Sequence, residues 1–160
     1  MAHIGQDLKL AKELLQSGQL VAIPTETVYG LAANALNPAA VAQIFAVKNR
    51  PQFDPLIVHV PDVKSMVRYA IEIPAPAQQL ADRFWPGPLT LLLKKNPIIP
   101  DLVTSGMDAV GLRCPDHPLT HQLLASMDFP LAAPSANPFG YVSPTTAAHV
   151  NDQLGNKIPY

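Results

Sequence analysis

Residues 20–31 read Leu-Val-Ala-Ile-Pro-Thr-Glu-Thr-Val-Tyr-Gly-Leu, a short apolar run followed at once by a polar turn. The run at 20–23 predicts a buried strand that stops at Pro24. In open α/β sheets, ligands bind in the crevice beyond the carboxyl ends of the strands. The hydroxyl, carboxylate and phenol groups of residues 25–29 therefore suit a small polar ligand. The competing interpretation is a helix cap, with Thr25 or Thr27 capping and Glu26 supporting the helix dipole.

The remaining chain alternates predicted helices and strands. Apolar spacing, caps and prolines predict helices at 7–17, 37–48, 62–71, 75–85 and 118–127, with a last helix opening at 143–145. Short apolar runs predict strands at 56–60, 89–93, 109–113 and 130–133, and residues 156–160 resemble the approach to another strand. This alternation predicts an α/β domain with a partly parallel sheet.

Composition restricts the class of protein. The chain has 160 residues, enough for one domain, and 48% of them are hydrophobic, which excludes a disordered chain. The formal net charge of −1 argues against a dedicated nucleic-acid-binding module, which would need a strongly basic surface. A single cysteine excludes an internal disulfide and fits a reducing compartment. With no membrane-length apolar run and no secretory signal core, we expect a cytoplasmic protein.

Two cations stand alone in the middle of the chain. Lys48 and Arg50 carry the only formal charges between Thr27 and Phe53, in the segment Lys-Asn-Arg-Pro. Arginine offers a planar fork and lysine a mobile point charge, and both are usual partners of phosphate oxygens. This pattern indicates an anion site. The alternative is an ordinary basic helix C-terminus, which the helix dipole favours.

A charge-free segment follows the strand predicted at 130–133. No Asp, Glu, Lys or Arg occurs from 129 to 150, and Ser135 and Asn137 lie between prolines. Their side chains can hydrogen-bond phosphate or ribose oxygens without adding charge. The alternative is a Ser- or Asx-type turn.

Five further residues give weaker signals. His59 lies within a predicted strand, where a structural histidine is the commoner finding. Arg113 ends another strand, and a salt bridge at the rim is its simplest role. Thr104 belongs to a turn expected at 104–106, Cys114 is expected to be a small buried residue, and Trp85 is expected to anchor the core or a turn. The sequence contains no phosphate-binding loop (G-x-x-x-x-G-K-[ST]) and no dinucleotide-binding motif (G-x-G-x-x-G). It also lacks the zinc-binding motif H-E-x-x-H and the G-x-S-x-G nucleophile elbow.

Six blocks in this order, within residues 20–146, resemble the YrdC-like family of threonylcarbamoyl-AMP synthases. They are Pro-Thr-Glu-Thr-Val-Tyr-Gly-Leu at 24–31, Lys-Asn-Arg at 48–50, Pro-Leu-Ile-Val-His at 55–59, Trp-Pro-Gly-Pro-Leu-Thr at 85–90, Gly-Leu-Arg-Cys-Pro at 111–115 and Ala-Pro-Ser-Ala-Asn at 133–137. The resemblance implies a twisted mixed parallel/antiparallel sheet, flanked by helices, around a central basic cavity. Any one block is weak evidence, but together they are specific.

The resemblance also implies a reaction. Family enzymes convert L-threonine, bicarbonate or carbon dioxide, and ATP into threonylcarbamoyl-AMP and pyrophosphate. A tRNA threonylcarbamoyl transferase machinery then uses this product to modify tRNA. Such chemistry needs positioning and charge neutralisation rather than a side-chain acid or base. Magnesium is expected with ATP, bridging its oxygens, with few protein ligands.

By the same resemblance, each candidate residue receives a role. ATP binding is assigned to Lys48, Arg50, Ser135, Asn137, Thr104 and Ser143. Threonine binding is assigned to Thr25, His59 and Arg113, with Arg113 as the carboxylate partner. No catalytic acid or base and no metal-ligating side chain is expected.

Two departures from the family pattern stand out. Gln-Phe-Asp at 52–54 replaces the usual Ser-Asp-Asn, and no Gly-x-x-Ser-Thr strand precedes Tyr160. We therefore expect residues 1–160 to form one YrdC-like domain that lacks its C-terminal strand or strands. Two other functions remain open: a non-catalytic relative that binds RNA weakly, and a carbamoyl-adenylate-forming domain of hydrogenase maturation.

Overall fold

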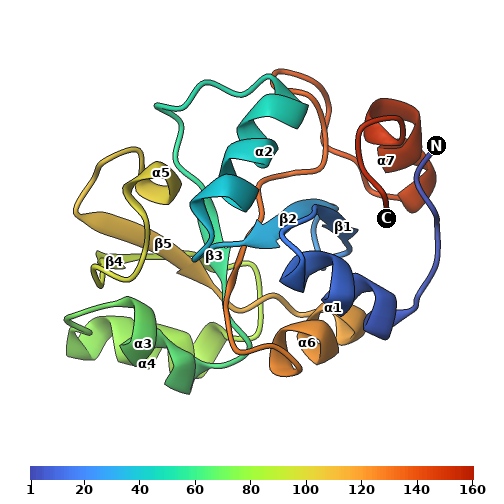
Figure 1. The fold of residues 1–160 in the computed structure, drawn as a ribbon. Coiled ribbons are helices and arrows are strands. Elements are labelled where there is room, and N and C mark those ends of the chain that lie inside the picture. Colours follow the sequence, from blue (N-terminus) through green and yellow to red (C-terminus); the bar gives the residue numbers. More distant parts are fainter.

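A computed structural model describes all residues 1–160 and contains one six-stranded sheet (Figure 1). The strands are β1 (Val21–Ile23), β2 (Gly30–Asn34), β3 (Ile57–His59), β4 (Leu91–Lys94), β5 (Ala109–Arg113) and β6 (Leu131–Ala132). Their order across the sheet is β1-β2-β6-β3-β5-β4. Only β3 and β5 are parallel, and every other neighbouring pair is antiparallel. The prediction of a mixed sheet flanked by helices is confirmed.

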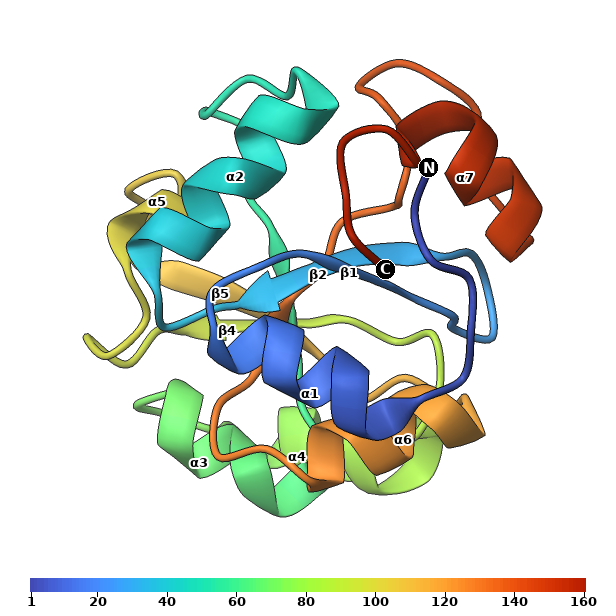
Figure 2. The same ribbon diagram turned by 45° about the vertical axis from the view of Figure 1, so that its right-hand side comes forward.

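The helices cover the sheet from both sides. They are α1 (Leu8–Gln16), α2 (Pro38–Lys48), α3 (Met66–Tyr69), α4 (Ala75–Phe84), α5 (Asp101–Thr104), α6 (Pro118–Ala125), α7 (Ala147–Leu154) and the 3₁₀ turn η1 (Val63–Ser65). In both ribbon views α1 and α2 lie on opposite sides of β2 (Figures 1 and 2). None of these helices combines the length and the apolar character that a membrane-spanning helix requires.

Local chemistry explains where the two best-predicted helices begin and end. The Asp7 carboxylate accepts hydrogen bonds from the backbone N–H groups of Lys9 and Leu10, which satisfies free donors at the start of α1. Gly18, with a φ of +80°, follows the end of that helix. Asn37 caps α2 in the same way, and Pro38 occupies its first turn.

The smaller hydrophobic cluster lies between one face of the sheet and two helices. Leu15 of α1 and Leu124 of α6 belong to it, together with Ile23, Ala32 and Leu131 from the strands. These side chains are at most 2% exposed. Burial of this apolar area fixes α1 and α6 over β1, β2 and β6.

The larger hydrophobic cluster includes the opposite face of the same strands. Val41 and Ile44 of α2 belong to it, together with Leu31, Ala33 and Val58, all fully buried. This packing places the C-terminal end of α2, which carries Lys48, beside the sheet. The packing of α2 against the core therefore positions Lys48, the first of the two predicted anion-binding cations.

The face that carries α1 and α6 is only partly covered farther along the sheet. The register pairs Ile57 with Gly111 and His59 with Arg113, so these four residues point to one side of β3 and β5. Leu92 pairs with Gly111 on the same side and is 70% exposed. This partly open face holds two of the residues predicted to bind threonine.

Several predicted elements need correction. Gly30–Asn34 forms β2 and Asp101–Thr104 forms α5, where neither a strand nor a helix was predicted. The turn expected at 104–106 follows directly after α5. The helix expected at 62–71 is divided into η1 and α3. The last helix begins at Ala147 rather than at 143–145, because Thr146 supplies its cap.

The two ends of the described chain lie side by side (Figures 1 and 2). The backbone N–H of His3 donates to the carbonyl oxygen of Pro159 over 2.9 Å, and that of Ala22 donates to Tyr160 over 2.9 Å. Residues 156–160 do not form a strand. The N-terminal segment and the last residues therefore pack together beside β1.

Candidate functional site

The polar turn after β1 is organised by the Thr25 hydroxyl. Its Oγ1 accepts hydrogen bonds from the N–H groups of Thr27 and Val28, each at 3.2 Å, and donates to the Val28 carbonyl at 2.6 Å. No helix starts here, so the alternative of a helix cap is wrong. The segment is instead a hydroxyl-stabilised turn that leads into β2.

This turn is joined directly to the charge-free segment after β6. The N–H of Leu31 donates to the Pro134 carbonyl at 2.7 Å, and the N–H of Ala136 donates to the Tyr29 carbonyl at 2.8 Å. Two blocks that are about a hundred residues apart in the sequence therefore form one strip of backbone.

Lys48 links α2 to that strip. Its Nζ donates to the Ser135 carbonyl at 2.6 Å and also to the Asn137 carbonyl, and the residue is only 1% exposed. No carboxylate forms an ion pair with it. Burial, followed by repulsion from Arg50, lowers the pKa of Lys48 to about 8. The structure thus keeps a buried amine whose charge lacks a counter-ion.

Arg50 is satisfied in a different way. Its Nη2 lies 2.9 Å from the Asp54 carboxylate, and its guanidinium also donates to the carbonyl oxygens of Asp54 and Pro55 at 3.1 and 3.0 Å. Its Cζ lies 5.9 Å from the centre of the Phe139 ring. These contacts place Arg50 at the C-terminal end of α2, close to the charge-free segment.

Of the remaining residues predicted to bind ATP, Asn137 has the most informative surroundings. Its Nδ2 donates to the carbonyl oxygens of Pro138 and Tyr141, both at 2.8 Å, while its buried Oδ1 has no partner. Ser135 and Ser143 are half-buried. Since buried polar atoms are normally hydrogen-bonded, the free Oδ1 marks a place where a ligand donor could bind.

Thr104 lies in a tightly bonded interior position. It is 1% exposed, and its hydroxyl donates to the Met107 carbonyl at 2.9 Å and accepts from Lys95 Nζ at 3.2 Å. These bonds stabilise the end of α5. A direct nucleotide contact through this hydroxyl would require them to break.

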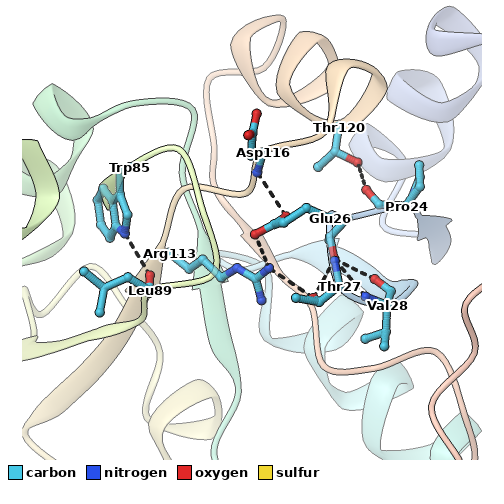
Figure 3. Close-up of polar contacts among 10 residues, drawn as sticks. Pro24, Glu26, Thr27, Val28, Trp85, Leu89, Arg113, Asp116 and Thr120 are labelled. Carbon is cyan, nitrogen blue, oxygen red and sulfur yellow. Dashed lines mark hydrogen bonds and ion pairs between the residues drawn. The ribbon is translucent and has the colours of Figure 1, made fainter. Parts of the chain in front are cut away.

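Arg113 reaches from the end of β5 to the polar turn (Figure 3). Its Nη2 lies 2.5 Å from Glu26 Oε1 and 3.1 Å from Thr27 Oγ1. The second oxygen of Glu26 accepts from the N–H of Asp116 at 3.0 Å. Arg113 Nε is buried and has no acceptor. The structure therefore brings Arg113 next to the turn that contains Thr25.

His59 lies beside Arg113 in the sheet. It is 3% exposed, and its Nδ1 has no hydrogen-bond partner. Burial, followed by the charge of Arg113, lowers the pKa of His59 to about 4. The imidazole is therefore neutral near pH 7 and can exchange hydrogen bonds with a ligand without carrying charge.

The pairing of Glu26 with Arg113 is the feature of the candidate site that the sequence did not reveal. The partners of Glu26, Arg113 and the Asp116 N–H, lie 87 and 90 residues away, so no local pattern signals the pairing. The sequence indicated two possible roles for this carboxylate, contact with a small polar ligand and support of a helix cap. The structure replaces the helix-cap role with a contact that joins the segments after β1 and β5.

Two residues have the structural roles expected of them. Cys114 is buried, its thiol contacts the Pro61 carbonyl, and burial raises its pKa to about 11. Trp85 is 8% exposed and donates through Nε1 to the Leu89 carbonyl at 2.8 Å (Figure 3). Neither side chain takes part in the candidate site.

A cavity of about 250 Å³ lies elsewhere, between the N-terminal segment, β1 and α7. It is lined mostly by apolar side chains, including Ile4, Val150 and Ile158. None of the nine residues predicted to bind ATP or threonine lines it. A central basic cavity is not shown, and it remains a prediction.

The fold and the gathered cations and hydroxyls define an α/β domain of the YrdC type. A solved structure of Sua5 from Pyrococcus abyssi, complexed with L-threonine, has a TM-score of 0.93 and 46% sequence identity over 98% of this chain and 46% of that chain. The chain belongs to the Sua5/YciO/YrdC family, whose model, described as "Telomere recombination", matches residues 13–160.

Curated relatives agree with this membership. A threonylcarbamoyl-AMP synthase of Pyrococcus abyssi is 47% identical over 94% of this chain and 44% of its own length. A threonylcarbamoyl-AMP synthase of Bacillus subtilis is 46% identical over 92% of this chain and 43% of its own length. The chain thus spans less than half the length of these two relatives.

Proposed function

We propose that this chain forms the synthase domain of a threonylcarbamoyl-AMP synthase, an ATP-dependent nucleotidyltransferase that serves tRNA modification. The observation that carries the proposal is 47% identity, over 94% of the chain, to a protein of that name. The likeness to a structure complexed with L-threonine supports threonine as a substrate. We propose further that residues 1–160 form one domain of this enzyme and that it works in the cytoplasm.

The proposed reaction has two steps. The threonine amine attacks carbon dioxide, which bicarbonate can supply, and loses a proton to give a carbamate. A carbamate oxygen then attacks the α-phosphorus of ATP, the bond from that phosphorus to the bridging oxygen breaks, and pyrophosphate leaves. Neither step needs a covalent enzyme intermediate, so positioning and charge stabilisation are the tasks left to the protein.

Lys48 and Arg50 are proposed to bind the ATP phosphates. Lys48 supports this role because its buried charge has no carboxylate partner, so a phosphate oxygen would supply the missing counter-charge. Arg50 would turn part of its guanidinium from Asp54 toward the nucleotide. The charge of both side chains would stabilise pyrophosphate as it leaves.

Ser135, Asn137 and Ser143 are proposed to complete the nucleotide site. The unpartnered Oδ1 of Asn137 supports this role, because it can accept from a ribose hydroxyl or an adenine amino group. Thr104 is retained only as a residue that supports the site, since its hydroxyl is already bonded to Met107 and Lys95.

Thr25, His59 and Arg113 are proposed to bind L-threonine. The unpartnered Arg113 Nε is a donor suited to the substrate carboxylate, and the neutral His59 ring offers a second uncommitted nitrogen. Thr25 would contribute from the turn that Arg113 touches through Thr27.

Magnesium is proposed to enter with ATP. It prefers oxygen ligands and is commonly held by substrate phosphates together with one or two carboxylates. Asp54, which is paired with Arg50, is the acidic side chain beside the proposed phosphate site. The structure contains no group of three or more His, Cys, Asp or Glu side chains that could hold a metal ion.

The proposed product passes to a tRNA threonylcarbamoyl transferase machinery. Weak RNA binding without catalysis and carbamoyl-adenylate formation in hydrogenase maturation are the two alternative functions. A solved HypF structure in a phosphate- and nucleotide-bound form shares the fold, with a TM-score of 0.84, but is only 24% identical. No contact within the site favours either alternative.

The test is pyrophosphate release from MgATP in bicarbonate buffer, with and without L-threonine. We expect release that depends on threonine, and threonylcarbamoyl-AMP as the second product. Binding of RNA by a folded chain that binds neither ATP nor threonine would support the RNA-binding alternative. Equal release with and without threonine would overturn the proposal.

A further inference from the structure

Glu26 connects two parts of the candidate site. Its Oε1 accepts a hydrogen bond from Arg113 Nη2 at 2.5 Å, and its Oε2 accepts one from the Asp116 N–H at 3.0 Å (Figure 3). The side chains of Glu26 and Arg113 are only 20% and 12% exposed, so water screens the pair weakly. We propose that Glu26 is a positioning residue that orients Arg113 toward the carboxylate of the amino-acid substrate, an inference that rests on the proposed function.

The hydrogen bonds of the guanidinium support this assignment. Glu26 and Thr27 both contact Nη2, which leaves Nε and Nη1 without protein partners. The Nε is buried, so its lack of an acceptor is costly unless a ligand provides one. Because a guanidinium is planar and rigid, holding Nη2 between two acceptors restricts the directions in which Nε and Nη1 point. Glu26 thereby determines where a second carboxylate can bind.

The same carboxylate also fixes the turn that carries Thr25. Glu26 lies between Thr25 and Thr27, whose hydroxyls are 3.0 Å apart. Its bond to the Asp116 N–H ties this turn to the segment that follows β5. Thr25 and Arg113 therefore keep a defined separation, which two groups on one small ligand require.

The charge balance fits a zwitterionic ligand. Burial raises the pKa of Glu26, but hydrogen bonds and the Arg113 charge outweigh this effect and leave the pKa below its usual value. Glu26 is therefore ionised at neutral pH and compensates Arg113. An amino acid, which carries no net charge, then needs orientation more than net attraction.

The test compares the wild-type chain with Glu26→Gln by titration calorimetry, using L-threonine, L-threoninamide and ATP as separate ligands. Glutamine keeps the shape of the side chain, but its amide N–H₂ group must face either the Arg113 guanidinium or the Asp116 N–H. Two donors then face each other, and one of the two hydrogen bonds is lost. We expect threonine affinity to fall about ten-fold, with ATP affinity unchanged within about two-fold. Threoninamide, which lacks the carboxylate, should bind weakly to both chains.

Two controls separate positioning from a general structural effect. Glu72→Gln removes another carboxylate, one whose contact with Lys94 at 3.4 Å is largely exposed, and it should change neither affinity. In an Arg113→Lys background, Glu26→Gln should change threonine affinity less than about two-fold, because the fork that it orients is gone.

Three results would overturn the inference. They are equal threonine affinity in the wild type and Glu26→Gln, equal losses of threonine and ATP affinity, and an undiminished effect in the Arg113→Lys background. Failure of the proposed function looks different: the wild type would bind threonine yet release no pyrophosphate, while the affinity comparison still tests Glu26. A wild type that does not bind threonine would overturn both.

Discussion

The surroundings of Lys48 and of Arg113 solve the problem of a buried cation in opposite ways. Lys48 donates to the neutral carbonyl oxygens of Ser135 and Asn137, and no carboxylate contacts it. Arg113 has a carboxylate partner in Glu26 at 2.5 Å. The first region carries an uncompensated positive charge, and the second is electrically balanced.

This difference matches the two proposed ligands. ATP is a polyanion, and an uncompensated ammonium both attracts it and becomes more stable when it binds. Threonine is a zwitterion, so a balanced pair that directs hydrogen bonds suits it better than net charge does. A buried cation thus attracts the ligand in the region of Lys48 and orients the ligand in the region of Arg113.

Replacing Lys48 should break the first region most severely. Lys48→Met keeps the length of the stem but removes the charge, and threonine-dependent pyrophosphate release should fall at least about a hundred-fold. The thermal midpoint should change little, because the loss of two hydrogen bonds is offset by removing a buried charge. Exposed Lys64→Met is the matched control, and near-normal release by Lys48→Met would contradict the charge argument.

Replacing Arg113 tests the second region. Arg113→Lys keeps one positive charge near Glu26 but loses the planar fork, so threonine affinity should fall about thirty-fold while ATP affinity stays unchanged. Calorimetry with each ligand measures both. If threonine affinity were unaffected, charge alone would be sufficient in this region, and the contrast with Lys48 would disappear.

Much of the fold could be predicted because local signals agree with the final structure. The caps at Asp7 and Asn37 and the apolar faces of α1 and α2 gave nearly correct helix ends. The strand β2 was missed because Gly-Leu-Ala-Ala-Asn contains no β-branched or aromatic residue. Its pairing with β1 and β6, rather than its own propensity, makes it a strand.

The candidate site was predictable in its parts but not in its connections. The lone charges of Lys48 and Arg50 and the charge-free segment around Asn137 are visible in the sequence. The bond from Lys48 to Ser135 and the pair of Glu26 with Arg113 each join residues 87 positions apart. Such contacts depend on strand order, which local patterns do not determine.

The pH dependence of stability should sharpen the contrast for Lys48. Its pKa is about 8 in the folded chain and near 10.5 when unfolded, so between these values the unfolded chain binds more protons. The contribution of Lys48 to the free energy of unfolding therefore rises with pH, by about 2–3 kcal/mol from pH 7 to 10.

Urea unfolding of the wild type and of Lys48→Met at several pH values measures this contribution. It is the part of the pH dependence of the free energy of unfolding that the wild type has and Lys48→Met lacks. ATP should also raise the pKa of Lys48, so binding at pH 9 should take up a proton in the wild type only. Calorimetry in buffers of different ionisation enthalpy detects that uptake. Parallel pH profiles for the two chains would show that the Lys48 charge is already compensated.

His59 should give the smallest effect, at acid pH. Its pKa is lowered from 6.5 to about 4 on folding, so in this window the unfolded chain again binds more protons. Stability from this group is complete above pH 6.5 and falls by about 2 kcal/mol by pH 5. His59→Phe should remove that part of the acid sensitivity, whereas exposed His121→Gln should retain it. Because the charge of Arg113 helps to lower the pKa of His59, Arg113→Gln should reduce the loss of stability at acid pH. An unchanged acid profile in Arg113→Gln would mean that burial alone lowers the pKa of His59.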